Sequence, residues 1–262
     1  MNSKSAVILA GGEGKRMKSD IPKPMNEVLG KPMLRWVIDS VKNAGIDDIC
    51  VVTGYKTEIT EAYLDSLPFE VSHVLQSERL GTGHAVMMAK DFLKKKSGDV
   101  VILCGDAPFM DTKTIADAYD SHSEGDYSAT VISAMLDDPT GYGRIVRNAD
   151  GTLKTIVEQK DADEATLKIK EVNSGGYWFD TEDLLSVLDH IKANNSAKEY
   201  YLPDALYLLL HNGKTAGAFT AASPDTVLGA NDPTQLAELV PPFIFLTRNQ
   251  NAFPCVQPEC TL

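Results

Sequence analysis

The chain has 262 residues, of which 43% are hydrophobic and 24% charged, and this composition is typical of a soluble globular protein. Its formal net charge of −12 argues against a nucleic acid or an anionic membrane as a partner, because their phosphates would be repelled. A small anionic substrate is not excluded, since a local cationic pocket and a divalent metal can override the overall field.

The cysteines indicate a reducing compartment. Cys50 and Cys104 lie in apolar, strand-like runs, which is typical of buried free thiols. Cys255 and Cys260 have no second Cys or His pair nearby, so we expect no zinc site. The N-terminal apolar run is too short for a signal peptide, and no run reaches the length of a membrane span. We therefore expect a cytoplasmic protein.

The first element is an apolar run that ends in a glycine-rich turn. Residues 6–10 predict a buried strand, Gly11, Gly12 and Gly14 follow in the turn, and the cations Lys15 and Arg16 come next. A backbone without Cβ atoms can wrap closely around an anion, and neighbouring cations favour a phosphate. Further on, the segment Pro22-Lys23-Pro24 holds a lysine between two prolines that stiffen it. We expect this region to grip the phosphates of a nucleotide.

Strands and helices alternate through the first half of the chain. We expect strands at 5–10, 48–53, 69–75, 100–104 and 127–136, and helices at 32–45, 56–67, 84–96 and 112–122. This alternation predicts βαβ units and a mainly parallel sheet, with the fully apolar 100–103 in a central strand.

The alternation of strands and helices ends near residue 127, after which strands follow one another with few helices between them. Here we expect strands at 127–136, 143–147, 153–158 and 169–180, helices at 181–193 and 203–212, a strand pair within 215–228 and a short helix at 232–239. Residues 240–262 show no clear periodicity, and we expect a poorly ordered tail or a surface strand.

Two common interpretations of the glycine loop fail. A Walker A loop needs a hydroxyl residue after its Gly-Lys pair, and Arg16 stands there instead. A dinucleotide-binding loop needs a third glycine, and Met17 occupies that position. The remaining alternative to a phosphate site is a plain turn with surface cations.

Two further segments carry candidate ligands at strand ends. Asp106 follows the apolar strand at 100–104, and a carboxylate at that edge commonly binds Mg²⁺, although it could instead cap the turn before Pro108. Gln76 offers a paired donor and acceptor that can match the edge of a base. We expect His84, at the start of the next helix, to be packed there and not to be catalytic.

Polar turns recur at the edges of apolar elements, as a polyhydroxylated ligand would require. They lie at 138–144, 157–158, 171–176 and 229–231. Each is equally compatible with ordinary turn chemistry.

Together these segments resemble the sugar-phosphate nucleotidyltransferases, and are most similar to the uridyltransferase domain of bacterial N-acetylglucosamine-1-phosphate uridyltransferases. The resemblance runs in order from about residue 5 to 239. The motifs that carry it are Leu9-Ala10-Gly11-Gly12-x-Gly14-x-Arg16-Met17, Pro22-Lys23-Pro24, Gln76 with Leu80-Gly81-Thr82-Gly83-His84-Ala85, Gly105-Asp106-x-Pro108, residues 137–145, residues 156–162, Glu171-x-Asn173-Ser174-Gly175 and Glu199-Tyr200-Tyr201-Leu202-x-Asp204.

The resemblance implies a fold and a division of roles. It implies an α/β, Rossmann-like three-layer sandwich with a mainly parallel mixed sheet, formed by a nucleotidyltransferase domain at 1–239 and followed by the tail at 240–262. It implies that UTP and N-acetylglucosamine-1-phosphate are the small-molecule partners and that Mg²⁺ is the cofactor. The implied site residues are Arg16, Lys23 and Asp106 for catalysis, Leu9, Ala10, Gly11, Gly12, Gln76, Gly81, Thr82 and Gly105 for the nucleotide, Gly143, Glu158 and Asn173 for the amino sugar, and Asp106 and Asn231 for the metal.

The chain departs from the family pattern at several positions. Lys15 stands where threonine or serine is usual, and Cys104 replaces the tyrosine that is common before Gly-Asp, near the nucleotide. Asn231 lies in a context that fits the family only loosely. No hexapeptide repeats are present, so we do not expect the acetyl transfer or the trimer that such repeats support in the best-known members.

Three alternatives remain open. The chain could transfer a different nucleotide or act on a different sugar phosphate, or it could be a catalytically silent relative that binds a sugar nucleotide. The retention of Arg16, Lys23 and Asp106 argues against the silent relative. A nicotinamide-dependent dehydrogenase is disfavoured by Met17 in place of the third glycine.

Overall fold

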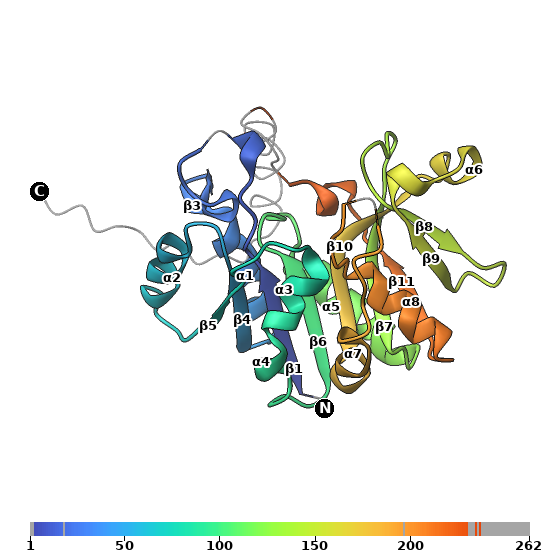
Figure 1. Cartoon of the computed structure of the whole chain (residues 1–262), viewed down its shortest axis with the longest axis horizontal. Coiled ribbons are helices and arrows are strands. Elements are labelled where there is room, and N and C mark those ends of the chain that lie inside the picture. The colour runs from blue at the N-terminus through green and yellow to red at the C-terminus, as the bar shows by residue number, and fades with distance from the viewer. Residues whose placement is uncertain (1–2, 18, 196, 230–233, 235, 237–262) are drawn as a thin grey trace, which may run out of the picture.

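A nine-stranded sheet runs through the part of the chain that the computed structural model describes, residues 3–17, 19–195, 197–229, 234 and 236 (Figure 1). Its main path, in the order β11-β7-β10-β6-β1-β4-β5, consists of β1 (Lys4–Leu9), β4 (Asp48–Thr53), β5 (Ser72–Leu75), β6 (Asp99–Cys104), β7 (Ala129–Met135), β10 (Glu171–Asp180) and β11 (Ala216–Thr220). Strands β8 (Arg144–Arg147) and β9 (Leu153–Val157) form a hairpin attached to β10. A separate small ribbon pairs β2 (Glu27–Val28) with β3 (Lys31–Pro32).

The main path is parallel except at one strand. β10 pairs antiparallel with both β6 and β7, and the other pairs along the path are parallel. The carboxyl ends of β1, β4, β5, β6 and β7 therefore share one edge of the sheet with the beginning of β10. This arrangement confirms the predicted mixed, mainly parallel sheet.

Helices cover both faces of the sheet, as the alternation of buried side chains along the strands requires. On β1, Val7 packs into one core, while Ala6 and Ile8 pack into the other. The first core includes α3 (Thr82–Met88), α4 (Lys90–Leu93), α7 (Thr181–Leu188) and α8 (Pro203–His211). The second includes α1 (Met33–Asn43), α2 (Thr57–Asp65) and α5 (Thr112–Glu124). The three-layer prediction is thereby confirmed.

The remaining helical pieces are short. They are α6 (Glu164–Leu167) and the 3-10 turns Lys15–Met17, Lys23–Met25, Gln159–Asp161 and Pro224–Val227. Within the described residues, no helix is long and apolar enough to cross a membrane.

Several predicted elements differ in extent from those observed. The strand expected at 69–75 begins only at Ser72, because Phe69 leaves the sheet and packs against Arg35 and Lys42 on the α1 side. The single helix expected at 84–96 divides at Ala89 into α3 and α4.

The remaining predictions concern the part of the chain after residue 214. The strand pair expected within 215–228 is wrong: only β11 forms, because Ser223 caps the following turn and Pro224 opens a 3-10 helix. The predicted helix at 232–239 lies almost entirely outside the described residues, and the predicted tail at 240–262 lies wholly outside them.

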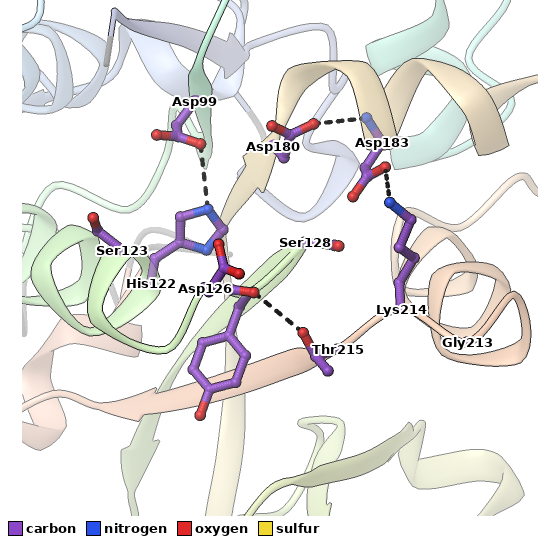
Figure 2. Close-up of a pocket in the computed structure, with 11 residues that line it drawn as sticks. Asp99, His122, Ser123, Asp126, Ser128, Asp180, Asp183, Gly213, Lys214 and Thr215 are labelled. Carbon is purple, nitrogen blue, oxygen red and sulfur yellow. Dashed lines mark hydrogen bonds and ion pairs between the residues drawn. The ribbon is translucent and has the colours of Figure 1, made fainter. Parts of the chain in front are cut away.

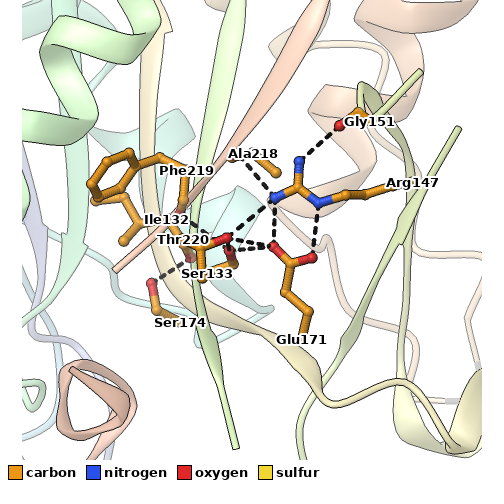
Figure 3. A network of polar contacts seen from close by, with 9 residues as sticks. All are labelled: Ile132, Ser133, Arg147, Gly151, Glu171, Ser174, Ala218, Phe219 and Thr220. Atoms are coloured by element: carbon orange, nitrogen blue, oxygen red, sulfur yellow. Dashed lines mark hydrogen bonds and ion pairs between the residues drawn. The ribbon is translucent and has the colours of Figure 1, made fainter. Parts of the chain in front are cut away.

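The β8–β9 hairpin is tied to the sheet by a charged network. Arg147 donates from Nε to Oε2 of Glu171 at 2.8 Å and from Nη2 to its Oε1 at 2.6 Å. Ser133 on β7 and Thr220 on β11 donate to the same Oε1 (Figure 3). Arg147 also reaches the carbonyls of Gly151 and Ala218. Arg147 therefore joins the hairpin directly to β10 and β11, and through Glu171 to Ser133 on β7.

Candidate functional site

A cavity of about 620 Å³ opens at the edge of the sheet where the parallel strands end. Its walls come from the segments after β1, β5 and β6, together with the start of α3 and the segment before α8. The lining residues are Leu9, Gly11, Gly12, Glu13, Lys23, Pro24, Gln76, Arg79, Gly81, Thr82, Ala85, Cys104, Asp106, Glu199 and Tyr201. Most of the residues that the sequence assigned to a nucleotide are thus brought together.

The glycine loop forms one wall of this cavity. Gly14 has a φ of +63°, and a Cβ added there would lie 2.6 Å from Cβ of Lys23, so the lysine packs directly over the loop. Ala10 and Gly105 are buried behind the wall, where the N–H of Gly105 donates to the carbonyl of Leu9 at 2.9 Å. These two support the loop and do not line the cavity.

Lys23 and Asp106 form an ion pair between Nζ and Oδ2. Their side chains are 13% and 26% exposed, so the pair sits at the cavity wall and not on the open surface. Asn26 holds the lysine segment in place, since its Nδ2 donates to the carbonyl of Lys23 at 2.9 Å. The stiffened segment that the two prolines predicted is therefore braced by a hydrogen bond as well.

Arg16 is exposed and does not line the cavity, although it follows the glycine loop directly. Another arginine takes a place on the wall: Arg79, whose Nη2 lies 3.3 Å from Oε2 of Glu13. Neither Glu13 nor Arg79 was among the predicted site residues, although both belong to the polar segments around the predicted ligands.

Gln76 is anchored from two sides. Its backbone N–H donates to the carbonyl of Thr53 at 2.8 Å, and its side chain is almost wholly buried. Its Nε2 lies 3.1 Å from the carbonyl oxygen of Gly81 and 3.1 Å from Nδ1 of His84. Both N–H groups of the amide are therefore engaged, so the structure differs from the expected donor–acceptor pair and leaves Oε1 as the polar group available to the cavity.

Residues 199–202, which precede α8 and are called the strap below, form another wall by crossing the start of α3. The N–H of Gly83 donates to the carbonyl of Tyr200 at 2.7 Å, and the N–H of Leu202 donates to Oγ1 of Thr82 at 3.0 Å. Gly81, at a φ of +104°, has no room for a Cβ, which would lie 2.6 Å from the oxygen of Tyr200. The strap places Glu199 and Tyr201 in the cavity. Neither residue was among the predicted site residues, although both belong to the family motif at 199–204.

The three residues assigned to the sugar form a second group. An added Cβ on Gly143 would lie 3.2 Å from Oε1 of Glu158, and the N–H of Asn173 donates to the carbonyl of Gly143 at 2.9 Å. Asn173 in turn donates from Nδ2 to the hydroxyl of Tyr177 at 2.7 Å. Burial, together with the charges of Asp161 and Asp204, raises the pKa of Glu158. The structure thus brings Gly143, Glu158 and Asn173 together, outside the lining of the large cavity.

Cys104 and Tyr177 connect the two groups. Sγ of Cys104 lines the cavity and lies 3.7 Å from the carbonyl of Gly175, whose N–H donates to Oδ1 of Asn173 at 2.9 Å. Burial, followed by the charge of Asp106, raises the pKa of Cys104 to about 12, so its thiol is neutral. Burial likewise raises the pKa of Tyr177, and the neighbouring charge of Glu158 adds to this effect. Contacts through Cys104, Gly175 and Asn173 therefore link the two groups.

Only part of the predicted metal site can be placed. Asp106 faces the cavity, whereas Asn231 lies outside the described residues. Among the residues that are described, no three His, Cys, Asp or Glu side chains group as metal ligands. An ion at Asp106 would therefore need oxygen ligands from elsewhere, such as a substrate.

A second cavity, of about 370 Å³, lies at the opposite edge of the sheet, around the start of β6 and the end of β10 (Figure 2). Several of its polar side chains contact one another. Nε2 of His122 lies 3.5 Å from Oδ1 of Asp99, and Nζ of Lys214 lies 2.7 Å from Oδ1 of Asp183. Asp180 caps α7 by accepting from the N–H of Asp183 at 2.8 Å. The sequence predicted no ligand here, and these contacts serve the fold.

Comparison with known proteins shows which family the chain belongs to. The profile of the family described as nucleotidyl transferase matches residues 5–224. The protein named Bifunctional protein GlmU from Acetivibrio thermocellus is 44% identical over 259 residues, and the one from Clostridium beijerinckii is 46% identical over 261 residues. Each alignment covers 98% of this chain and 56% of the relative, so the chain spans about half the length of these curated relatives.

Solved structures agree on the fold. A UDP-glucose pyrophosphorylase complexed with UDP-glucose superposes with a TM-score of 0.74 at 19% identity, covering 94% of this chain and 100% of that one. A Bacillus anthracis structure described as a glucose-1-phosphate thymidylyltransferase in complex with sucrose has a TM-score of 0.76 at 20% identity, covering 96% of this chain and 98% of that one. At these identities the likeness shows a shared fold.

Proposed function

Because this chain belongs to the nucleotidyl transferase family, we propose that it transfers the uridylyl group of UTP to N-acetylglucosamine-1-phosphate, giving UDP-N-acetylglucosamine and pyrophosphate. The observation that carries the proposal is the cavity at the carboxyl edge of the sheet, where the glycine loop, Gln76 and the Lys23–Asp106 pair meet. Identity of 44% and 46% to the two GlmU proteins, over nearly the whole of this chain, supports the choice of substrates.

In this proposal the large cavity holds the nucleotide. The backbone of Leu9 to Gly12 and the side chain of Gln76 would contact the uridine, with Gly81 and Thr82 on the facing wall. Lys23 and Arg16 would neutralise the phosphates, since two anionic reactants must be brought together. The volume of about 620 Å³ is within the range of small-molecule sites.

The sugar phosphate would occupy the adjoining group of Gly143, Glu158 and Asn173. Glu158 can accept hydrogen bonds from sugar hydroxyls when it is ionised, and the backbone of Gly143 lies beside it. Asn173 keeps one Nδ2 hydrogen for a ligand, because the other is donated to Tyr177. The two substrates would then meet near Cys104 and Asp106.

The residues present fit a divalent cation. Asp106 is a carboxyl residue at the cavity wall that pairs with the ammonium of Lys23. Mg²⁺ is commonly held by one or two carboxylates together with substrate phosphates. Asp106 and Asn231 would hold it here, and when bound it would screen the repulsion between the reactants and polarise the phosphoryl oxygens.

The reaction needs no covalent enzyme intermediate. An oxygen of the sugar-1-phosphate attacks the α-phosphorus of UTP in line, the bond from that phosphorus to the bridging oxygen breaks, and pyrophosphate leaves. The contribution of the protein is to hold both substrates in register and to place Lys23 and Arg16 where negative charge accumulates.

Pyrophosphate release tests the proposal directly. The purified chain is assayed with UTP, dTTP, CTP, GTP and ATP, each combined with N-acetylglucosamine-1-phosphate, glucosamine-1-phosphate or glucose-1-phosphate. We expect the highest kcat/KM for UTP with N-acetylglucosamine-1-phosphate. We also expect EDTA to abolish turnover and added Mg²⁺ to restore it.

Two outcomes would contradict the proposal. A clear preference for another pair would replace the substrates but keep the reaction class. Binding of UDP-N-acetylglucosamine without turnover in the presence of Mg²⁺ would indicate a catalytically silent relative.

A further inference from the structure

The amide of Gln76 is held in one orientation. The atom that lies 3.1 Å from the carbonyl oxygen of Gly81 must be the nitrogen Nε2, because a carbonyl oxygen only accepts. The same nitrogen lies 3.1 Å from Nδ1 of His84. Each N–H of the amide thus has one acceptor. Rotating the amide by half a turn would place Oε1 next to both acceptors, where the carbonyl oxygen of Gly81 could not donate a hydrogen bond to it.

This geometry also defines the state of His84. The orientation of the amide makes Nδ1 of His84 the acceptor of this hydrogen bond, which corresponds to the tautomer with its proton on Nε2. The histidine is held by its place in the first turn of α3 and by the ring of Tyr200, whose centroid lies 6.1 Å away. The strap that carries Tyr200 is itself fixed to Gly83 by a hydrogen bond of 2.7 Å.

The oxygen of the amide is the end that remains for a ligand. Oε1 of Gln76 points toward the glycine loop, since a Cβ added to Gly11 would lie 2.9 Å from it. Within the described part of the chain, no hydrogen bond is donated to this oxygen, and both Gln76 and Gly11 line the large cavity. The cavity therefore presents an acceptor at this point and no donor from Gln76.

We propose that His84 is a positioning residue that sets the base preference of the site by fixing the Gln76 amide with Oε1 toward the nucleotide. This inference rests on the proposed function, in which Gln76 meets the base. An acceptor favours a base that offers a ring N–H, as uracil does at N3, over cytosine, whose N3 carries a lone pair. His84 is not among the residues that line the cavity, so it acts through Gln76.

Steady-state kinetics of His84→Ala and His84→Asn test the proposal. We expect His84→Ala to raise KM for UTP by about tenfold, the factor that corresponds to one lost hydrogen bond, while kcat stays within about twofold. The ratio of kcat/KM for UTP over CTP should fall by a similar factor, because the amide becomes free to turn. Asparagine can offer Oδ1 near the position of Nδ1, so His84→Asn should restore most of the preference.

The matched controls are His211→Ala and His211→Asn, which change an exposed histidine at the end of α8. We expect them to leave KM and the base preference unchanged. An unaltered UTP-to-CTP ratio in His84→Ala would overturn the inference. So would equal losses of kcat and Tm in both His84 variants, since these would indicate a purely structural role.

A second measurement does not depend on which nucleotide is used. Nitrogen-15 NMR of the wild-type histidine rings should show His84 with its proton on Nε2 and an unprotonated Nδ1, and an Nδ1–H form would contradict the proposed contact. If the wild type turned over no uridine nucleotide, the proposed function would fail. The inferred role in base preference would then fail with it, even if NMR showed the contact.

Discussion

The pairing of Lys23 with Asp106 joins two residues that the sequence assigned separately to phosphate and metal. Both side chains are partly buried at the cavity wall, where the local dielectric is lower than in water and the ion pair is stronger than it would be on the open surface. The pair compensates the charge of both residues in the absence of a ligand. We expect Lys23 to exchange its carboxylate partner for a phosphate when the nucleotide binds.

Asp106→Ala and Arg16→Ala test the catalytic assignments. Groups that stabilise charge in the transition state of phosphoryl transfer lower the activation free energy by roughly a few kcal/mol each. Either change should therefore lower turnover by at least about a hundredfold with the fold intact. The measurements are pyrophosphate release and circular dichroism. Asp137→Ala is the control, because the side chain of Asp137 is fully exposed and forms a surface ion pair with Lys170 at 3.1 Å. Near-normal rates would disprove the role of the residue changed, and Arg16 faces the harder test because it does not line the cavity.

Glu158 makes a pH dependence testable. Burial, followed by the charges of Asp161 and Asp204, raises the pKa of this carboxyl, so it becomes protonated at a higher pH than an ordinary glutamate. As the pH falls through that raised pKa, Glu158 would become a neutral and weaker acceptor for sugar hydroxyls, and KM for the sugar phosphate should rise. Glu158→Gln should have a high KM at every pH, without the rise that protonation of Glu158 causes in the wild type. The titration of the substrate phosphate affects KM in both proteins alike. Identical KM profiles in the two proteins would exclude this role.

The β8–β9 hairpin owes its position to the network around Arg147 (Figure 3). The hairpin matters to the site because Gly143 precedes β8 and Glu158 follows β9. Burial alone would raise the pKa of Glu171, but hydrogen bonds from Arg147 and Ser133 outweigh it and lower the pKa. The carboxylate is therefore stabilised in its ionised form, and the network adds stability to the folded protein at neutral pH.

Arg147→Ala should destabilise the protein by about 2–3 kcal/mol, since it leaves the largely buried carboxylate of Glu171 without its charged partner. Urea unfolding measures this change, and KM for the sugar phosphate should rise as the hairpin loosens. The loss should shrink at low pH, because the contribution of Glu171 is present above its ordinary pKa and disappears as the pH falls through its lowered one. Lys170→Ala, which breaks an exposed pair, is expected to cost less than about 1 kcal/mol. A loss equally small for Arg147→Ala would show that the network carries little energy.

Element types were more predictable than element limits. The apolar runs at β1, β4 and β6 identified strands because buried parallel strands are apolar on both faces. The end of β11 was not predictable from periodicity, because Ser223 and Pro224 turn an apolar stretch into a 3-10 helix through local capping. The late start of β5 depends on Phe69 packing against α1, a contact between separate elements.

Binding of UTP should stabilise the whole fold, because the cavity is lined by segments from residue 9 to residue 201. At a free concentration one hundred times Kd, a ligand that binds only the folded state adds about 2.7 kcal/mol to the free energy of unfolding. Thermal unfolding with UTP and Mg²⁺ should therefore show a clear rise in Tm, and CTP at the same concentration should give a smaller one. No shift with UTP would contradict the assignment of the cavity to this nucleotide.

The sequence by itself determined the class of fold, the family and most of the residues at the candidate site. It did so because glycines, prolines and strand-end carboxylates act locally, and their order along the chain carries the family pattern. Only the tertiary structure decided how these residues work together: the Lys23–Asp106 pair, the hold of His84 on Gln76, and the places of Glu199 and Tyr201. The Lys23–Asp106 pair and the contacts of the segment that carries Glu199 and Tyr201 join parts of the chain that are far apart in sequence, whereas Gln76 and His84 are only eight residues apart. These contacts depend on the order of strands in the sheet and on the strap across α3, which hydrophobic periodicity does not encode.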